Sequence, residues 1–157
     1  FLHSLSDELA ESDKFAEVPP GSTANLFQKL AGRIDTAIHP RDLSAGQQLA
    51  LVLAIQLVKD AKVLILDEPT RGLDYAAKRA LAKQLESIRS QDRTVLLATH
   101  DIEFVAMVAD RVLVLENGKL IQDGLPTDLL TRGQPLASQI AEITQEPGLI
   151  TIEQVIS

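Results

Sequence analysis

The 157-residue sequence contains no cysteine, which excludes a disulfide framework and a thiolate metal site. Aromatic residues make up only 3% of the chain, so leucine, isoleucine, valine and alanine must fill any core. No apolar run approaches the roughly 18 residues that a membrane-spanning helix needs. Basic residues are also few, since 15 Lys and Arg stand against 22 Asp and Glu, for a net charge of -7. This balance argues against broad contact with a nucleic-acid backbone.

Apolar residues make up 45% of the chain, which is enough for a core in one domain of ordinary size. From Leu43 onward, short apolar runs alternate with amphipathic stretches that begin at capping residues. This alternation predicts a parallel α/β sheet, and its continuous apolar strands are expected to be covered on both faces. The predicted elements are a helix after Ser44, a strand over 62–67, a helix after Asp74, a strand over 94–99, a helix after Asp101 and a hairpin turning at Asn117-Gly118.

The segments on either side of this pattern predict short helices. Residues 1–42 are predicted to hold one helix that Ser4 or Ser6 caps and a second that Ser22 caps. Residues 125–157 predict a tail of short helices.

Three polar side chains follow the two predicted strands. Asp67 and Glu68 follow the first strand, and His100 follows the second. In open α/β sheets the ligand site lies beyond the carboxyl ends of the strands. Two adjacent carboxylates there suit a Mg²⁺-nucleotide site, where one holds the metal and the other activates a water. Each carboxylate could instead be a helix cap or a surface charge, and His100 could be structural.

Residues 44–47, with the sequence SAGQ, predict a helix start. Ser44 and Gln47 have the spacing of a capping box. A helix N-terminus is also an anion site, and Gly46 allows a ligand to approach closely. The two interpretations are compatible.

Four motifs in this order resemble the ATPases of ABC transporters. The resemblance rests on LSAGQ at 43–47 for the signature (usually LSGGQ), VLILDEP at 63–69 for the Walker B strand, RGLD at 71–74 for the D-loop, and ATHD at 98–101 for the H-loop. The stretch DEPTRGLDYAAKRAL and the ending LITIEQVIS resemble the energy-coupling factor (ECF) group, which takes up vitamins or cobalt and nickel ions.

The resemblance implies a fold class and a division of the chain. The fold would be α/β, the C-terminal part of a P-loop NTPase (RecA-like) ABC ATPase core with part of the helical signature subdomain. Residues 1–60 would be the helical part ending in the signature and its helix. Residues 61–124 would be the Walker B, D-loop and H-loop core with the hairpin, and residues 125–157 the C-terminal helical tail.

The resemblance also implies roles for the residues of the two strand ends. Asp67 would bind Mg²⁺ through water, Glu68 would be the general base of ATP hydrolysis, and His100 would contact the γ-phosphate. Asp74 would reach across a dimer interface.

The signature residues would act on a second subunit. Ser44, Ala45, Gly46 and Gln47 would contact ATP that a partner ATPase holds, with Ser44 and Gly46 at its γ-phosphate. Ala45 stands where the family usually has glycine, so weakened but not abolished signature function is expected.

ATP and Mg²⁺ are therefore the expected cofactors. The expected partners are a second ABC ATPase subunit or fused half and a transmembrane transporter subunit, with no nucleic acid. The expected location is the cytoplasmic face of the cell membrane.

No G-x-x-x-x-G-K-[ST] phosphate loop occurs in the sequence. The resemblance places that loop before Phe1, so the chain alone is expected not to hydrolyse ATP. It also places the strand that feeds the loop between the strands over 62–67 and 94–99, which would leave these two strands without a shared neighbour. Two alternatives stay open: a non-transport ABC protein acting on DNA or ribosomes, and a non-catalytic fragment.

Overall fold

The computed structural model describes residues 4–144, 146, 149–151 and 154. It divides the chain into two compact units, Phe1–Ala98 and Thr99–Ser157, and each is described by itself. The first unit contains α1 (Leu5–Ala16), α2 (Ser22–Ala31), the short 3-10 helix η1 (Pro40–Asp42), α3 (Ala45–Leu57), β1 (Val63–Asp67), α4 (Tyr75–Arg89) and β2 (Thr94–Ala98). The second contains α5 (Ile102–Val108), β3 (Val112–Glu116), β4 (Lys119–Gly124), α6 (Pro126–Leu129) and α7 (Gln139–Thr144).

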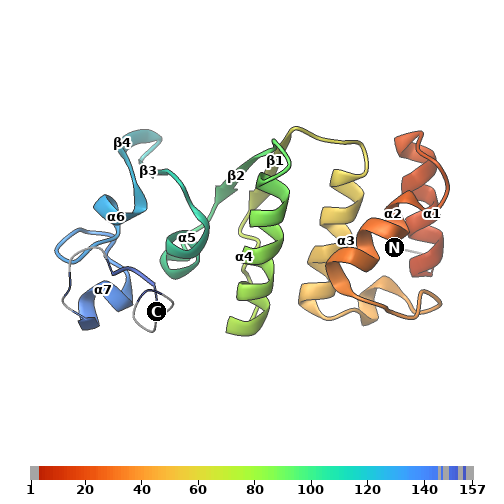
Figure 1. The fold of residues 1–157 in the computed structure, drawn as a ribbon, viewed down its shortest axis with the longest axis horizontal. Helices are drawn as coiled ribbons and strands as arrows, with labels where there is room; N and C mark the ends of the chain where they lie inside the picture. The colour runs from red at the N-terminus through yellow and green to blue at the C-terminus, as the bar shows by residue number, and fades with distance from the viewer. Residues whose placement is uncertain (1–3, 145, 147–148, 152–153, 155–157) are drawn as a thin grey trace. The chain divides into compact units, whose positions relative to one another are not determined.

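The first three helices pack together at the amino-terminal end of the chain (Figure 1). Ser4, one of the two predicted caps, is the N-cap of α1 and forms a capping box with Asp7. Apolar side chains from α1, α2 and α3 meet in one cluster. Its buried members are Leu5, Leu9, Phe27, Leu43, Ala50, Leu51 and Ala54.

The predicted N-cap of α2 is wrong. Gly21 is the N-cap, with φ of 87°, and it has no side chain to cap the helix. The carboxylate of Asp13 on α1 caps α2 instead. It accepts hydrogen bonds from the N–H of Gly21 at 2.6 Å and from the N–H of Thr23 at 2.7 Å. The buried Asp13 therefore joins α1 to the start of α2.

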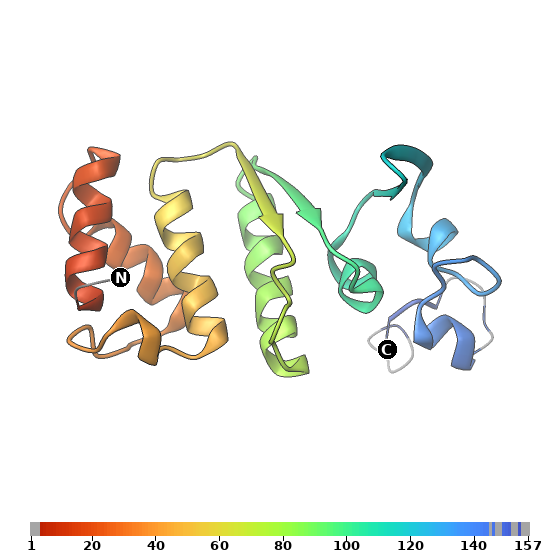
Figure 2. The ribbon, with the colours of Figure 1, turned by 180° about the vertical axis from the view of Figure 1, so that it is seen from behind.

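The two strands of the first unit are direct neighbours (Figure 2). β1 and β2 pair in parallel, with Val63 opposite Thr94 and Asp67 opposite Ala98. The prediction that another strand separates them is therefore wrong. Their parallel alignment and the order of helices and strands agree with the predicted α/β fold.

The prediction that both faces of these strands are covered is also wrong for this chain. Leu64 and Leu66 are buried on one face of the strand pair. On the opposite face the exposed fraction is 56% for Val63, 69% for Ile65 and 52% for Leu96. The described residues supply a covering layer for only one face.

The second unit contains the predicted hairpin. β3 and β4 are antiparallel, and the turn between them places Asn117 and Gly118 at φ of 49° and 74°. These left-handed angles explain the Asn-Gly turn, because both residue types tolerate positive φ. An apolar cluster around Leu130, Ala141 and Ile150 forms beside α5. The structure divides the chain after Ala98, whereas the sequence predicts boundaries after residues 60 and 124. The predicted division into three segments stays a prediction.

Within the residues described, no helix combines the length and apolar composition that crossing a bilayer requires.

Candidate functional site

The candidate site begins at the carboxyl ends of β1 and β2. Asp67 is the last residue of β1 and its side chain is exposed. The N–H of Glu68 donates to the carbonyl oxygen of Ala98 at 2.8 Å, so the strand pairing continues one residue beyond β1. Glu68 then takes a left-handed conformation with φ of 46°. Non-glycine residues rarely adopt such angles. At Glu68, the second of two adjacent carboxylates, the chain turns out of the sheet.

A compact loop carries the chain from Glu68 to α4. The N–H of Arg71 donates to the carbonyl of Glu68 at 3.1 Å, and the N–H of Leu73 donates to the carbonyl of Thr70 at the same distance. Thr70, a member of this loop, is buried. Asp74 ends the loop as the N-cap of α4, where its Oδ1 accepts from the N–H of Ala77 at 2.8 Å. The cap predicted at Asp74 is confirmed.

The start of α3 has the predicted capping box. The N–H of Ser44 donates to Gln47 Oε1 at 2.9 Å, and Ser44 Oγ accepts from the N–H of Gln47 at 3.3 Å. Ala45 is exposed. The N–H groups of Ala45 and Gly46 belong to the first helical turn, whose donors the helix itself does not use. The turn is therefore a helix cap, and it also leaves backbone N–H donors directed along the helix axis. Anion binding at a helix N-terminus requires such donors.

The structure brings the start of α3 close to the start of α4. A Cβ added at Gly46 would lie 4.0 Å from the Cβ of Ala77. Because Asp74 caps the same turn of α4, the predicted signature and D-loop residues lie on adjacent helix starts. Sequence order alone does not give this neighbourhood, since the two turns are about thirty positions apart.

His100 lies in the other unit. It is an exposed residue between β2 and α5, next to Asp101, which caps α5 through the N–H of Phe104 at 3.1 Å. The cap predicted at Asp101 is confirmed. The two units are described separately, so the contact between His100 and a phosphate held near Glu68 stays a prediction.

The residues of the first unit suit a magnesium nucleotide in their donor chemistry. Mg²⁺ binds in proteins through one or two carboxylates together with substrate phosphates and water. Asp67 offers an exposed carboxylate at the strand end. Among the described residues, no cluster of three or more His, Cys, Asp or Glu side chains could hold a metal.

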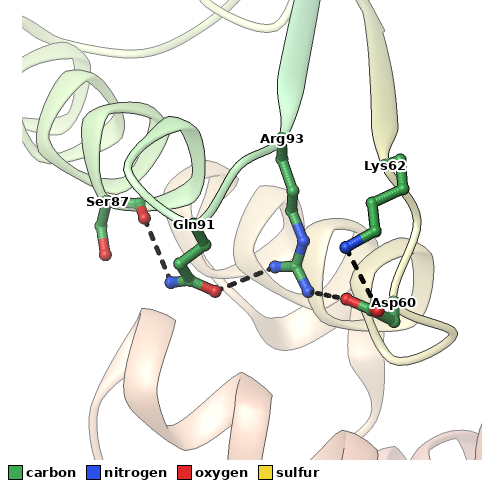
Figure 3. A network of polar contacts seen from close by, with 5 residues as sticks. All are labelled: Asp60, Lys62, Ser87, Gln91 and Arg93. Atoms are coloured by element: carbon green, nitrogen blue, oxygen red, sulfur yellow. Dashed lines mark hydrogen bonds and ion pairs between the residues drawn. The ribbon is translucent and has the colours of Figure 1, made fainter.

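Sequence reasoning missed a second polar network, at the opposite end of the strands (Figure 3). Arg93 precedes β2 and bonds Asp60, which follows α3, at 2.7 Å. Lys62 Nζ lies 3.6 Å from the same carboxylate. Charged residues next to both strands are the only sequence signal for this network, and charges at such positions are usually solvated.

Comparisons with known proteins agree on the type of domain. A family model described as "AAA domain, putative AbiEii toxin, Type IV TA system" matches residues 12–106. A Streptomyces coelicolor protein named "Putative ABC transporter ATP-binding protein" is 39% identical over 155 residues, which are 99% of this chain and 28% of that protein. The energy-coupling factor transporter ATP-binding protein EcfA2 of Lactococcus lactis is 38% identical over 125 residues, which are 74% of this chain and 43% of that protein.

A solved structure gives the same result for the fold. CbiO1 from Clostridium perfringens, described as part of the ABC transporter complex CbiONQ, matches with a TM-score of 0.70 and 30% sequence identity. The match covers 82% of this chain and 53% of that one. This chain thus spans well under two thirds of the length of each of these relatives. The family model matches more than half of the chain and includes both the helix start at Ser44 and the strand end at Asp67. The chain therefore belongs to the family of AAA domains that this model describes, and it is homologous to the ATP-binding proteins of ABC transporters.

Proposed function

We propose that this chain is a part of an ATP-hydrolysing subunit of a membrane transporter, of the ECF type that imports vitamins or cobalt and nickel ions. The similarity to EcfA2 and to CbiO1 supports the ECF assignment. The longer relatives support the idea that the phosphate loop belongs to another part of the same protein. In this proposal the subunit works with a second ATPase subunit or half and a transmembrane subunit at the cytoplasmic face of the membrane.

One observation carries the proposal of hydrolysis. The hydrogen bond from the N–H of Glu68 to the carbonyl of Ala98 holds Glu68 at the end of the paired strands, and its backbone there is left-handed. Residues held at sparsely populated backbone angles are concentrated at functional sites. A helix cap or a surface charge would need neither the extra strand pairing nor this angle.

In the proposed reaction, Glu68 accepts a proton from a water molecule. The water oxygen attacks the γ-phosphorus, the bond to the bridging oxygen breaks, and ADP leaves with the electron pair of that bond. Asp67 would hold Mg²⁺, which neutralises charge on the phosphate oxygens when it is bound. Without a cation, Asp67 and Glu68 would repel the phosphates of ATP.

The signature turn would contribute from the opposite subunit. Ser44 and Gly46 would contact the γ-phosphate of ATP held by the partner, with Ala45 and Gln47 completing the turn and Asp74 beside it at the interface. The adjacency of the α3 and α4 starts supports a joint role for these residues. His100 would contact the γ-phosphate of the ATP bound in its own subunit.

The experiment is the Glu68→Gln substitution in the protein at the full length of its relatives. Glutamine keeps the size of the side chain but cannot accept the proton, so ATP hydrolysis should fall by about 10²–10⁴-fold. ATP binding should persist, because Asp67 still holds the metal. Steady-state hydrolysis and equilibrium binding of MgATP are the measurements.

The control is Glu86→Gln, a matched change at an exposed position on α4. It should leave hydrolysis unchanged. Wild-type turnover in Glu68→Gln would remove Glu68 from the role of general base.

A further inference from the structure

Two hydrogen-bonded links join the helices α1–α3 to α4 and the strands. Gln84 on α4 donates from Nε2 to the carbonyl of Leu30, at the end of α2, at 2.7 Å. Arg93 donates from Nη2 to Asp60 Oδ1, also at 2.7 Å. Hydrogen bonds are directional, whereas apolar packing is not. These links can therefore fix the orientation of the helices in a way that apolar contact alone does not.

Arg93 is the central residue of the second link (Figure 3). Its side chain is only 13% exposed. One guanidinium nitrogen reaches Asp60 and the other, Nη1, donates to Gln91 Oε1 at 3.1 Å. Gln91 in turn donates from Nε2 to the carbonyl of Ser87 at 3.1 Å. The planar guanidinium thus connects the end of α4 to the end of α3, a fork geometry that a lysine cannot reproduce.

Asp60 receives this link immediately after α3. Its backbone is left-handed, with φ of 55°, and its N–H donates to the carbonyl of Leu57 at 3.0 Å. The hydrogen bond from Arg93, together with the nearby charge of Lys62, lowers the pKa of Asp60. The carboxylate is therefore charged at neutral pH, and the link is formed under ordinary conditions.

The link sits at one end of the helix whose other end carries the signature turn. α3 has 13 residues, so its length is about 20 Å. A tilt of about 10° at the carboxyl end would move Ser44 by about 3 Å. A misplacement of about 1 Å at a reacting group can reduce a rate about 10²-fold. The position of Ser44 is therefore sensitive to how the far end of α3 is held.

We propose that Arg93 and Asp60 are positioning residues for the signature turn: their ion pair anchors the carboxyl end of α3 and so sets where Ser44 and Gly46 meet the phosphate. The expected effect of this ion pair on catalysis rests on the proposed function. Its expected effect on the position of α3 rests on the hydrogen-bond network alone.

The test uses the full-length protein with Arg93→Gln, Asp60→Asn, the double variant and Arg93→Lys. Arg93→Gln should lower kcat for ATP hydrolysis about tenfold with the KM for MgATP within about twofold, because the residues proposed to hold MgATP are themselves unchanged. The double variant should have the same kcat as Arg93→Gln, because either single substitution already removes the interaction between the two residues. Arg93→Lys should recover only part of the rate.

A second measurement follows the helix directly. Spin labels at the exposed positions Val52 on α3 and Glu86 on α4 report the distance between the two helices. Arg93→Gln should broaden this distance distribution while the melting temperature changes little, because Asp60 is 69% exposed and remains solvated when its partner is lost. This readout separates positioning from a general loss of stability.

The control is Arg111→Gln, which removes an ion pair elsewhere in the chain, the bidentate one to Asp123 at 2.6 and 2.7 Å. It should change neither kcat nor the distance distribution. An unchanged distribution in Arg93→Gln, or additive losses in the double variant, would overturn the proposal. If the unmodified protein hydrolyses no ATP, the proposed function fails, and the label distances still decide whether Arg93 positions α3.

Discussion

The helical region (α1–α3) and the strand pair (β1 and β2) of the first unit differ in how their apolar side chains are buried. In the helical region, Leu5 and Ala54 belong to the shared apolar cluster and have no exposed surface. In the strand pair, the exposed fraction is 69% for Ile65 and 52% for Leu96. The helical region therefore supplies its own core, whereas the strand pair has one apolar face that the described residues leave open.

This difference indicates that the strand pair, and not the helical region, has a face on which another segment can pack. Exposed apolar patches usually mark surfaces that contact something else, and an unpaired strand edge invites pairing with another strand. We propose that the segment carrying the phosphate loop covers the open face in the full-length protein. Three predictions test the comparison, in order of decreasing effect.

The largest effect is expected in the core around α3. Leu53→Ala should lower the free energy of unfolding by about 2–5 kcal/mol, because it leaves a cavity in a fully buried site. Ile65→Ala in this chain should change it by no more than about 0.5 kcal/mol, as is usual at an exposed position. Urea unfolding followed by circular dichroism measures both changes.

The same pair of variants sharpens the comparison at full length. There Ile65→Ala should become as costly as a core substitution, about 2–5 kcal/mol, if the open face is covered. A neutral Ile65→Ala at full length would show that nothing packs on this face.

The second prediction concerns the carboxylate that joins α1 and α2. Asp13→Asn should cost about 1–3 kcal/mol, because both carboxylate oxygens accept hydrogen bonds and asparagine has a single acceptor oxygen. Burial alone would raise the pKa of Asp13, but hydrogen bonds from Thr23, Gly21 and Ser22 outweigh it and lower the pKa below 3.8.

The sign of the pH dependence follows from this lowered pKa. The stabilisation is complete above pH 3.8, the ordinary value for an aspartate, and is lost as the pH falls through the lower folded-state pKa. Thermal unfolding between pH 2 and 6 should therefore show a smaller acid loss of stability in Asp13→Asn than in the unmodified protein. Equal acid losses would contradict the prediction.

The smallest effect comes from the two serine capping boxes. Ser4→Ala and Ser44→Ala should each cost about 1 kcal/mol, because each removes one N-terminal cap. Only Ser44→Ala should also lower ATP hydrolysis, by about 2–10-fold, the equivalent of one neutral hydrogen bond. Equal hydrolysis in the two variants of the full-length protein would reduce Ser44 to a structural cap.

Much of the local structure was predictable because its signals act within one turn of chain. The caps at Ser44, Asp74 and Asp101 each receive a backbone N–H three positions later, so the residue type and spacing suffice. The left-handed Asn117-Gly118 turn was predictable for the same reason. The order of motifs also indicated the family that the comparisons then identified.

The sequence by itself thus determined the caps at Ser44, Asp74 and Asp101, the strands, and the order of the motifs. Only the tertiary structure decided that Asp13 rather than Ser22 caps α2, that β1 pairs directly with β2, and that Arg93 reaches Asp60 across 33 positions. The physical reason is range. A cap or a turn is chosen by neighbours within a few residues, whereas the partner of a strand edge or a buried guanidinium is chosen by whichever distant segment the packed core brings beside it.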